Sequence, residues 1–71
     1  MLVSFEAYNE LDKRYYVNIT NVAYLKPHHA NEHATVIYFA IGNENGLKYI
    51  YVKGTLDDVA RRLNEPHVLH V

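Results

Sequence analysis

The pattern over residues 35–53 constrains the fold of this chain more than any other feature does. Residues 35–41 read TVIYFAI and residues 47–53 read LKYIYVK, two runs rich in β-branched and aromatic side chains, which favour strands. The segment between them, GNENG, supplies glycine and asparagine, which tolerate the positive φ angles of tight turns. These residues predict an antiparallel β-hairpin.

A short helix is predicted directly after the hairpin. Gly54 ends the second strand, Thr55 suits the N-cap position, and two aspartates follow where the positive end of the helix dipole favours anions. Four apolar residues then recur at the spacing of one helix face: Leu56, Val59, Ala60 and Leu63. The sequence therefore predicts a helix that lies on a sheet.

The end of this helix is predicted from two residues that disfavour helical structure. Asn64 and Pro66 should end it, since proline removes a backbone donor and clashes with the preceding turn. The last five residues, HVLHV, alternate histidine with aliphatic side chains, which is the pattern of an edge strand in the monomer or in a neighbouring molecule.

Three shorter strands are predicted before the hairpin. They span residues 2–8, 14–19 and 22–25, the last being either a bent extension of the second or a strand of its own, and Pro27 should end it. Residues 9–13 between the first two carry turn-forming side chains. The predicted fold class is α+β: a four- to five-stranded antiparallel sheet with one short C-terminal helix packed on one face.

The length and composition predict one small domain, residues 1–71, that gains stability from association. A chain of 71 residues buries a modest share of its surface, and without cysteine it cannot form disulfides. The first residues show no basic leader followed by an apolar run, and no segment is apolar enough to span a bilayer, so a cytoplasmic protein is expected.

The register of the hairpin decides which side chains share a face. A four-residue loop places Ile37, Phe39, Ile50 and Val52 together as a core face and gathers Tyr38, Tyr49 and Tyr51 opposite. A five-residue loop exchanges the sets, because a shift of one residue moves every side chain to the other face. We favour the first alternative, since it separates aliphatic side chains from tyrosines.

On this interpretation the sheet presents a tyrosine-rich face. The chain has seven tyrosines, and tyrosine suits half-buried binding surfaces because its ring is apolar and its hydroxyl seeks a partner. Tyr16 and Asn18 are expected to join this face. Candidate binding residues around it are Tyr24, Lys26, His28, His29, Lys53, Arg61 and Arg62. A contiguous exposed patch of this kind predicts an interaction site.

The stretch KPHHANEHATV concentrates three of the five histidines. A helical turn there would place His29 and His33 four residues apart, a spacing able to hold Zn²⁺, but two ligands do not make a site. We therefore interpret the stretch as a polar connector and predict no metal and no cofactor. Near pH 6 its histidines and Lys26 would form a conditional basic patch beside Tyr24.

Catalysis is not indicated. Cysteine is absent, the single serine, Ser4, lies in an apolar strand, and the three glycines match neither a P-loop nor a dinucleotide fingerprint. Asp57 and Asp58 are interpreted as ordinary N-terminal helix charges. The sequence predicts a protein that is not an enzyme.

The succession VNITNVAYLKP, ATVIYF and LKYIYVKGTLDDVARRL resembles the sheet-and-helix segment of LytTR-type DNA-binding domains. It is at least as similar to small FlbD-type flagellar proteins and to uncharacterised phage and prophage proteins of comparable length. HVLHV after the helix offers no basic recognition segment, so the resemblance does not imply DNA binding.

The function predicted from these features is that of a small binding or regulatory protein. It would act through protein-protein interaction, in the way that phage and prophage proteins modulate a host protein, and would form a homodimer or larger oligomer. The alternative is a nucleic-acid or nucleotide binder that uses the tyrosines and the basic edge. The net charge of −1 weighs against this alternative.

Overall fold

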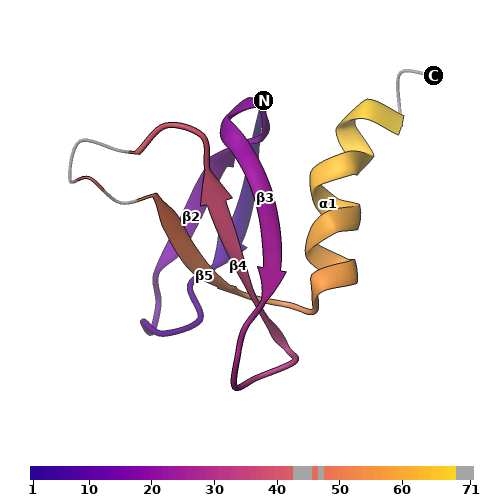
Figure 1. The fold of residues 1–71 in the computed structure, drawn as a ribbon. Helices are drawn as coiled ribbons and strands as arrows, with labels where there is room; N and C mark the ends of the chain where they lie inside the picture. The colour runs from indigo at the N-terminus through magenta and orange to yellow at the C-terminus, as the bar shows by residue number, and fades with distance from the viewer. Residues whose placement is uncertain (43–45, 47, 69–71) are drawn as a thin grey trace.

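The computed structural model describes residues 1–42, 46 and 48–68. Five antiparallel strands and one C-terminal helix form an α+β fold (Figure 1), which confirms the predicted fold class. The strands form two sheets rather than the single predicted sheet. The first sheet pairs β1 (Leu2–Glu6) with β2 (Arg14–Asn18); the second has the order β3 (Val22–Pro27), β4 (Ala34–Phe39), β5 (Tyr49–Lys53), and the helix α1 spans Leu56–Val68.

The two sheets meet at a corner where the chain leaves β1. Ala7 forms an isolated bridge with Val52 of β5, and the Tyr8 N–H donates to the Tyr51 carbonyl at 3.0 Å. This change of partner ends the first strand at Glu6 rather than at Tyr8. The last strand of the chain therefore lies beside the first.

A short 3-10 turn, η1 (Ile19–Asn21), separates β2 from β3. The Asn18 side chain caps it by accepting from the Thr20 N–H at 3.1 Å. Of the two alternatives for residues 22–25, the separate strand is therefore correct, and it ends at Pro27 as predicted.

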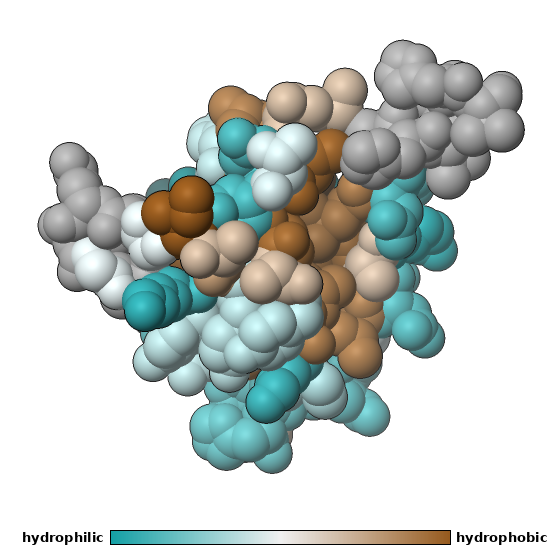
Figure 2. All heavy atoms as spheres, turned by 45° about the horizontal axis from the view of Figure 1, so that its top comes forward, coloured by the Kyte–Doolittle hydropathy of each residue, from teal (hydrophilic) through white to brown (hydrophobic). Residues whose placement is uncertain are grey.

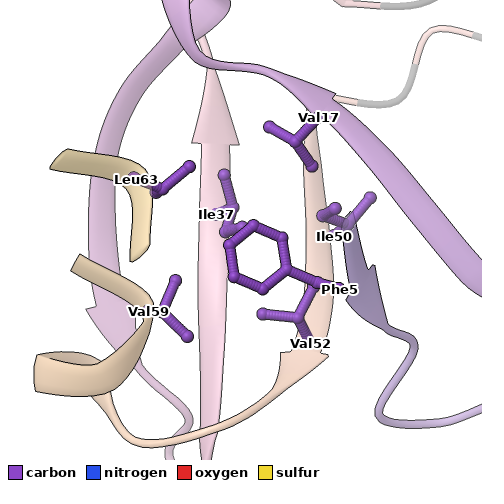
Figure 3. Close-up of a cluster of buried hydrophobic side chains, with 7 residues drawn as sticks. All are labelled: Phe5, Val17, Ile37, Ile50, Val52, Val59 and Leu63. Atoms are coloured by element: carbon purple, nitrogen blue, oxygen red, sulfur yellow. The ribbon is translucent and has the colours of Figure 1, made fainter. Parts of the chain in front are cut away.

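The hydrophobic core lies between the second sheet, the first sheet and the helix (Figure 3). Both β1–β2 and α1 pack on the same face of the three-stranded sheet. The side chains on its opposite face therefore do not belong to this core. The buried cluster consists of Phe5, Val17, Ile37, Ile50, Val52, Val59 and Leu63. Burial of each of these side chains is worth about 1.5–3 kcal/mol relative to exposure.

The register of the hairpin is the one that separates aliphatic residues from tyrosines. Ile37 lies opposite Ile50, and Tyr38 lies opposite Tyr49. This confirms the strand register of the four-residue alternative, although both strands are shorter than predicted. Residues 43–45 and 47 of the connecting segment lie outside the described residues.

The helix starts as predicted and ends later. The Thr55 hydroxyl accepts from the Asp58 N–H at 3.2 Å, which confirms the N-cap. The prediction that Asn64 and Pro66 end the helix is wrong, because α1 continues to Val68. Pro66 falls in the last turn of α1, so the hydrogen bond that it removes lies close to the point where the helix ends and the earlier turns are not interrupted. The predicted edge strand is correspondingly wrong for residues 67 and 68, and residues 69–71 lie outside the described residues.

Apolar side chains also line a groove between β3 and α1. Its volume is about 280 Å³, and its walls include Val22, Leu25, Ala60 and Leu63. Figure 2 shows apolar residues gathered at the centre of this face, with hydrophilic residues on the helix side. Partly buried Val22 and Leu25 pack against the core cluster, so the groove is an opening of the core rather than a separate patch.

Candidate binding surface

The outer face of the three-stranded sheet carries a row of tyrosines, one from each of β3 and β4 and two from β5. We call Tyr24, Tyr38, Tyr49 and Tyr51 the tyrosine face. The register creates it, since Tyr24 pairs with Tyr38 and Tyr38 pairs with Tyr49, while Tyr51 follows Tyr49 by two residues. Ring centroids along the row are 4.5 Å, 5.6 Å and 5.6 Å apart. The predicted clustering of Tyr38, Tyr49 and Tyr51 is therefore observed.

The rings of this row contact one another. Tyr24 and Tyr38 are stacked with an interplanar angle of 17°. The Lys26 ammonium lies 5.9 Å from the Tyr24 ring centroid and 5.8 Å from that of Tyr38, within the range of cation–π attraction. The stacking thus uses one face of the Tyr24 ring and one face of the Tyr38 ring within the protein.

The histidine connector extends the aromatic row at its Tyr51 end. The His28 ring lies 5.2 Å from that of Tyr51, 4.9 Å from that of Tyr8 and 4.5 Å from that of His29. Its Nδ1 atom accepts from the Ala30 N–H at 3.0 Å. His28 and His29 therefore extend the aromatic row beyond Tyr51, and the expected basic patch beside Tyr24 stays a prediction.

The connector takes a bent conformation and not the helical turn that would place His29 and His33 on one side. The Asn31 side chain accepts from the His33 N–H at 2.8 Å and donates to the Tyr8 hydroxyl at 3.2 Å. The His33 carbonyl accepts from the Gly54 N–H at 2.7 Å. Over the residues the structure describes, no three His, Cys, Asp or Glu side chains are grouped closely enough to hold a metal ion.

The charge on this face is positive. β3, β4 and β5 contain Lys26 and Lys53 but no aspartate or glutamate. The Lys53 ammonium lies 3.3 Å from the Glu6 carboxylate, which also lies 3.3 Å from the Arg14 guanidinium. Lys53 therefore sits at the corner of the two sheets with its charge already paired, and Lys26 is the cation placed among the tyrosines.

Tyr51 is the titratable group of the face with a shifted pKa. Its partial burial raises the pKa above the ordinary value of 10.0, and its neighbours Tyr49 and Tyr38 raise it further. Loss of contact with water disfavours the phenolate. Tyr51 thus stays a neutral hydrogen-bonding group over the physiological range.

Three predicted site residues lie elsewhere. Tyr16 and Asn18 lie in β2 of the first sheet, where Tyr16 pairs with Ser4 of β1. The expectation that they join the tyrosine face of the second sheet is therefore wrong. Arg61 and Arg62 lie on α1, which packs on the opposite face of the three-stranded sheet. The error for Tyr16 and Asn18 follows from treating all strands as one sheet.

Both arginines have structural contacts of their own. Arg61 pairs with Asp58 at 3.0 Å on the exposed side of the helix. The Arg62 guanidinium lies 4.5 Å from the Phe5 ring centroid and donates to the Ser4 carbonyl at 2.6 Å. Arg62 therefore joins the helix to β1.

Two residues of the surface are absent from the sequence-based predictions. Tyr8 reaches His28 because the chain turns toward β5 at Ala7, and no local pattern indicates that turn. Val36 lies between Lys26 and Tyr51 in the strand pairing and is buried, so it forms the floor of the tyrosine face. Its position follows from the alternation of side chains along β4.

Comparisons with models of protein families, with curated proteins and with solved structures found no match to this chain. The resemblance to FlbD-type and LytTR-type proteins therefore stays a prediction. In the part of the chain that the structure describes, no helix has the length and apolar character needed to cross a membrane.

Proposed function

We propose that this protein is a non-enzymatic binding protein whose tyrosine face docks a protein partner that carries carboxylate side chains. The observation that carries the proposal is the uninterrupted aromatic row from Tyr24 to His28 with Lys26 placed over two of its rings. Tyrosine combines a large apolar contact with a hydroxyl at its tip, and it is enriched among residues that dominate interface energies.

The charge of the face supports an acidic partner. Its strands lack acidic residues, and Lys26 lies beside the rings of Tyr24 and Tyr38. Two copies of this face placed against each other would bring cations toward cations, which disfavours self-association through it. Carboxylates of another protein would satisfy both the ammonium and the tyrosine hydroxyls.

A nucleic-acid ligand is the second candidate, favoured by the cation beside an aromatic sheet face. Base recognition on such faces depends on stacking against exposed ring faces. The stacking of Tyr24 on Tyr38 occupies one face of each of these two rings, and Lys26 lies beside both. The ring arrangement therefore supports protein binding better than base stacking.

Partner capture with two charge-reversal variants tests the proposal. Immobilised wild-type protein at physiological salt should retain a partner, and the Lys26→Glu variant should not. The Lys13→Glu variant is the control and should retain the partner, because Lys13 pairs with Glu10 in the β1–β2 turn, away from the tyrosine face. Equal capture by both variants would contradict the proposal. Retention of a labelled single-stranded oligonucleotide that falls with Lys26→Glu and with added salt would favour the second candidate instead.

A further inference from the structure

β2 presents a strand edge that no described strand pairs with. The Ala7 N–H donates to the Lys13 carbonyl at 2.9 Å, and the Ile19 N–H donates to the Met1 carbonyl at 3.4 Å. These two bonds determine which opposite residues of β1 and β2 form hydrogen-bonded pairs. Opposite residues alternate between hydrogen-bonded and non-hydrogen-bonded pairs. The backbone groups of Tyr15 and Val17 therefore point toward β1, and those of Arg14, Tyr16 and Asn18 point away.

These outward backbone groups have no strand partner in the described part of the chain. The strand order places β2 at the end of its sheet, and no backbone hydrogen bond joins its outward side to another described residue. Unpaired backbone donors and acceptors along a regular strand form a template for a further strand. β2 therefore offers a regular edge at which the sheet can be extended.

Of the other strands that end a sheet, β1 and β5 are joined at the corner by the Ala7–Val52 bridge, and the Ser4 carbonyl of β1 accepts from Arg62. β3 is protected in the ways that natural edge strands usually are. A register shift lies between Val22 and Tyr24, Lys26 and Pro27 follow, and α1 packs beside it. β2 contains neither proline nor lysine, and its pairing with β1 has an unbroken register. β3 is therefore a shielded edge, whereas β2 is available to pair with another strand.

An apolar recess accompanies the available edge. A cavity of about 600 Å³ opens between β2 and the end of the β4–β5 hairpin. Tyr16 is 68% exposed and Ile41 is 74% exposed at its rim. Large apolar side chains beside unpaired backbone groups indicate that this edge is covered by protein in the functional state.

We propose that β2 is the self-association edge of this protein, with the β2 strands of two copies paired antiparallel about a twofold axis at Tyr16. Tyr16 is the central residue of this five-residue strand, so its outward N–H and C=O can exchange both hydrogen bonds with Tyr16 of the other copy. Arg14 then lies opposite Asn18 of the other copy. No like charges face each other across the axis.

A second copy suits this edge better than an unrelated strand does, because the edge is complementary to itself under the commonest oligomer symmetry. A chain of 71 residues without cysteine also gains from the extra burial. The resulting four-stranded sheet leaves the tyrosine face of each copy open. This inference therefore does not depend on the proposed function.

Sedimentation equilibrium from low to high micromolar concentration tests the arrangement. Wild-type protein should dimerise, while Tyr16→Lys and Tyr16→Glu should each weaken association at least about 100-fold, because like charges then meet across the axis. An equimolar mixture of the two variants should restore the dimer. Leu11→Lys adds the same charge in the 91% exposed turn before β2 and should associate like the wild type.

Amide hydrogen exchange of the wild type gives a second measurement that needs no variant. The Tyr16 and Asn18 amides should gain protection as the protein concentration rises, whereas the Val17 amide should be protected at all concentrations. A wild type that stays monomeric, a Tyr16→Lys variant that dimerises normally, a variant mixture that stays monomeric, or concentration-independent exchange at Tyr16 would each overturn the inference.

Discussion

Single side chains join parts of this fold that are distant in sequence. The Asn21 side chain accepts from the Ile41 N–H at 3.0 Å and donates to the Ile41 carbonyl at 3.1 Å, as a strand residue would. His28 similarly joins the connector to Tyr8 and Tyr51. Neither role can be predicted from sequence, because each depends on where a distant backbone segment passes.

Asn21→Ala removes both side-chain bonds to Ile41 at once. We expect it to lower the free energy of unfolding by about 1–2 kcal/mol, because each such bond contributes about 0.5–1.5 kcal/mol and the site is partly exposed. Urea denaturation measures this. Asn9→Ala changes an exposed amide in the turn after β1 and should cost less; equal effects would contradict the assigned role of Asn21.

The raised pKa of Tyr51 predicts a loss of stability at high pH. The folded protein holds the phenolic proton more tightly than the unfolded chain does, so this stabilisation is complete below pH 10.0 and is lost as the pH rises through the folded-state pKa. The unfolding temperature should therefore fall above pH 10.0, and less steeply in Tyr51→Phe. Identical slopes for the variant and the wild type would contradict this.

At the scale of elements, alternation and spacing predict the strands and the start of the helix well. The tyrosines separate from Ile37, Ile50 and Val52 because side chains alternate across a strand, and Thr55 caps the helix because its hydroxyl suits the first turn. Local pattern does not reveal how elements are divided between sheets. The expectation that Tyr16 joins the tyrosine face is wrong for that reason.

The two adjacent arginines of α1 should differ in their effect on stability. Arg62→Ala removes a guanidinium over Phe5 and a bond to Ser4, and we expect a loss of about 1–2 kcal/mol. Arg61→Ala breaks exposed ion pairs and should cost under about 0.5 kcal/mol. Thermal unfolding of both variants measures the difference; a larger loss for Arg61→Ala would refute the docking role of Arg62.

The link between β5 and α1 depends on Gly54. Its φ of +123° is one that residues with a Cβ rarely adopt, and an added Cβ would lie 3.2 Å from Val59 Cγ2. Gly54→Ala should therefore destabilise the fold by about 2 kcal/mol or more. Gly46→Ala, at a φ of +78° with open space around it, should cost about 1 kcal/mol. Chemical denaturation that ranks them in the reverse order would contradict this account.

At the scale of the whole molecule, the position of the core explains why a binding face is available. Both β1–β2 and α1 cover the same side of the three-stranded sheet, so the tyrosines on its other side stay partly exposed. The sequence predicts this segregation of tyrosines. It does not predict the corner at Ala7, which brings Tyr8 to His28 and adds the histidines to the row.

The affinity of the protein for its captured partner, measured by titration calorimetry at physiological salt, tests the central claim most directly. Tyr38→Ala and Tyr49→Ala should each weaken binding by about 30-fold or more, the loss expected for tyrosines at the centre of an interface. Leu11→Ala, in a turn away from the tyrosine face, should bind like the wild type. Unchanged affinity in both tyrosine variants, with the fold intact by circular dichroism, would contradict the assignment of the tyrosine face as the binding surface.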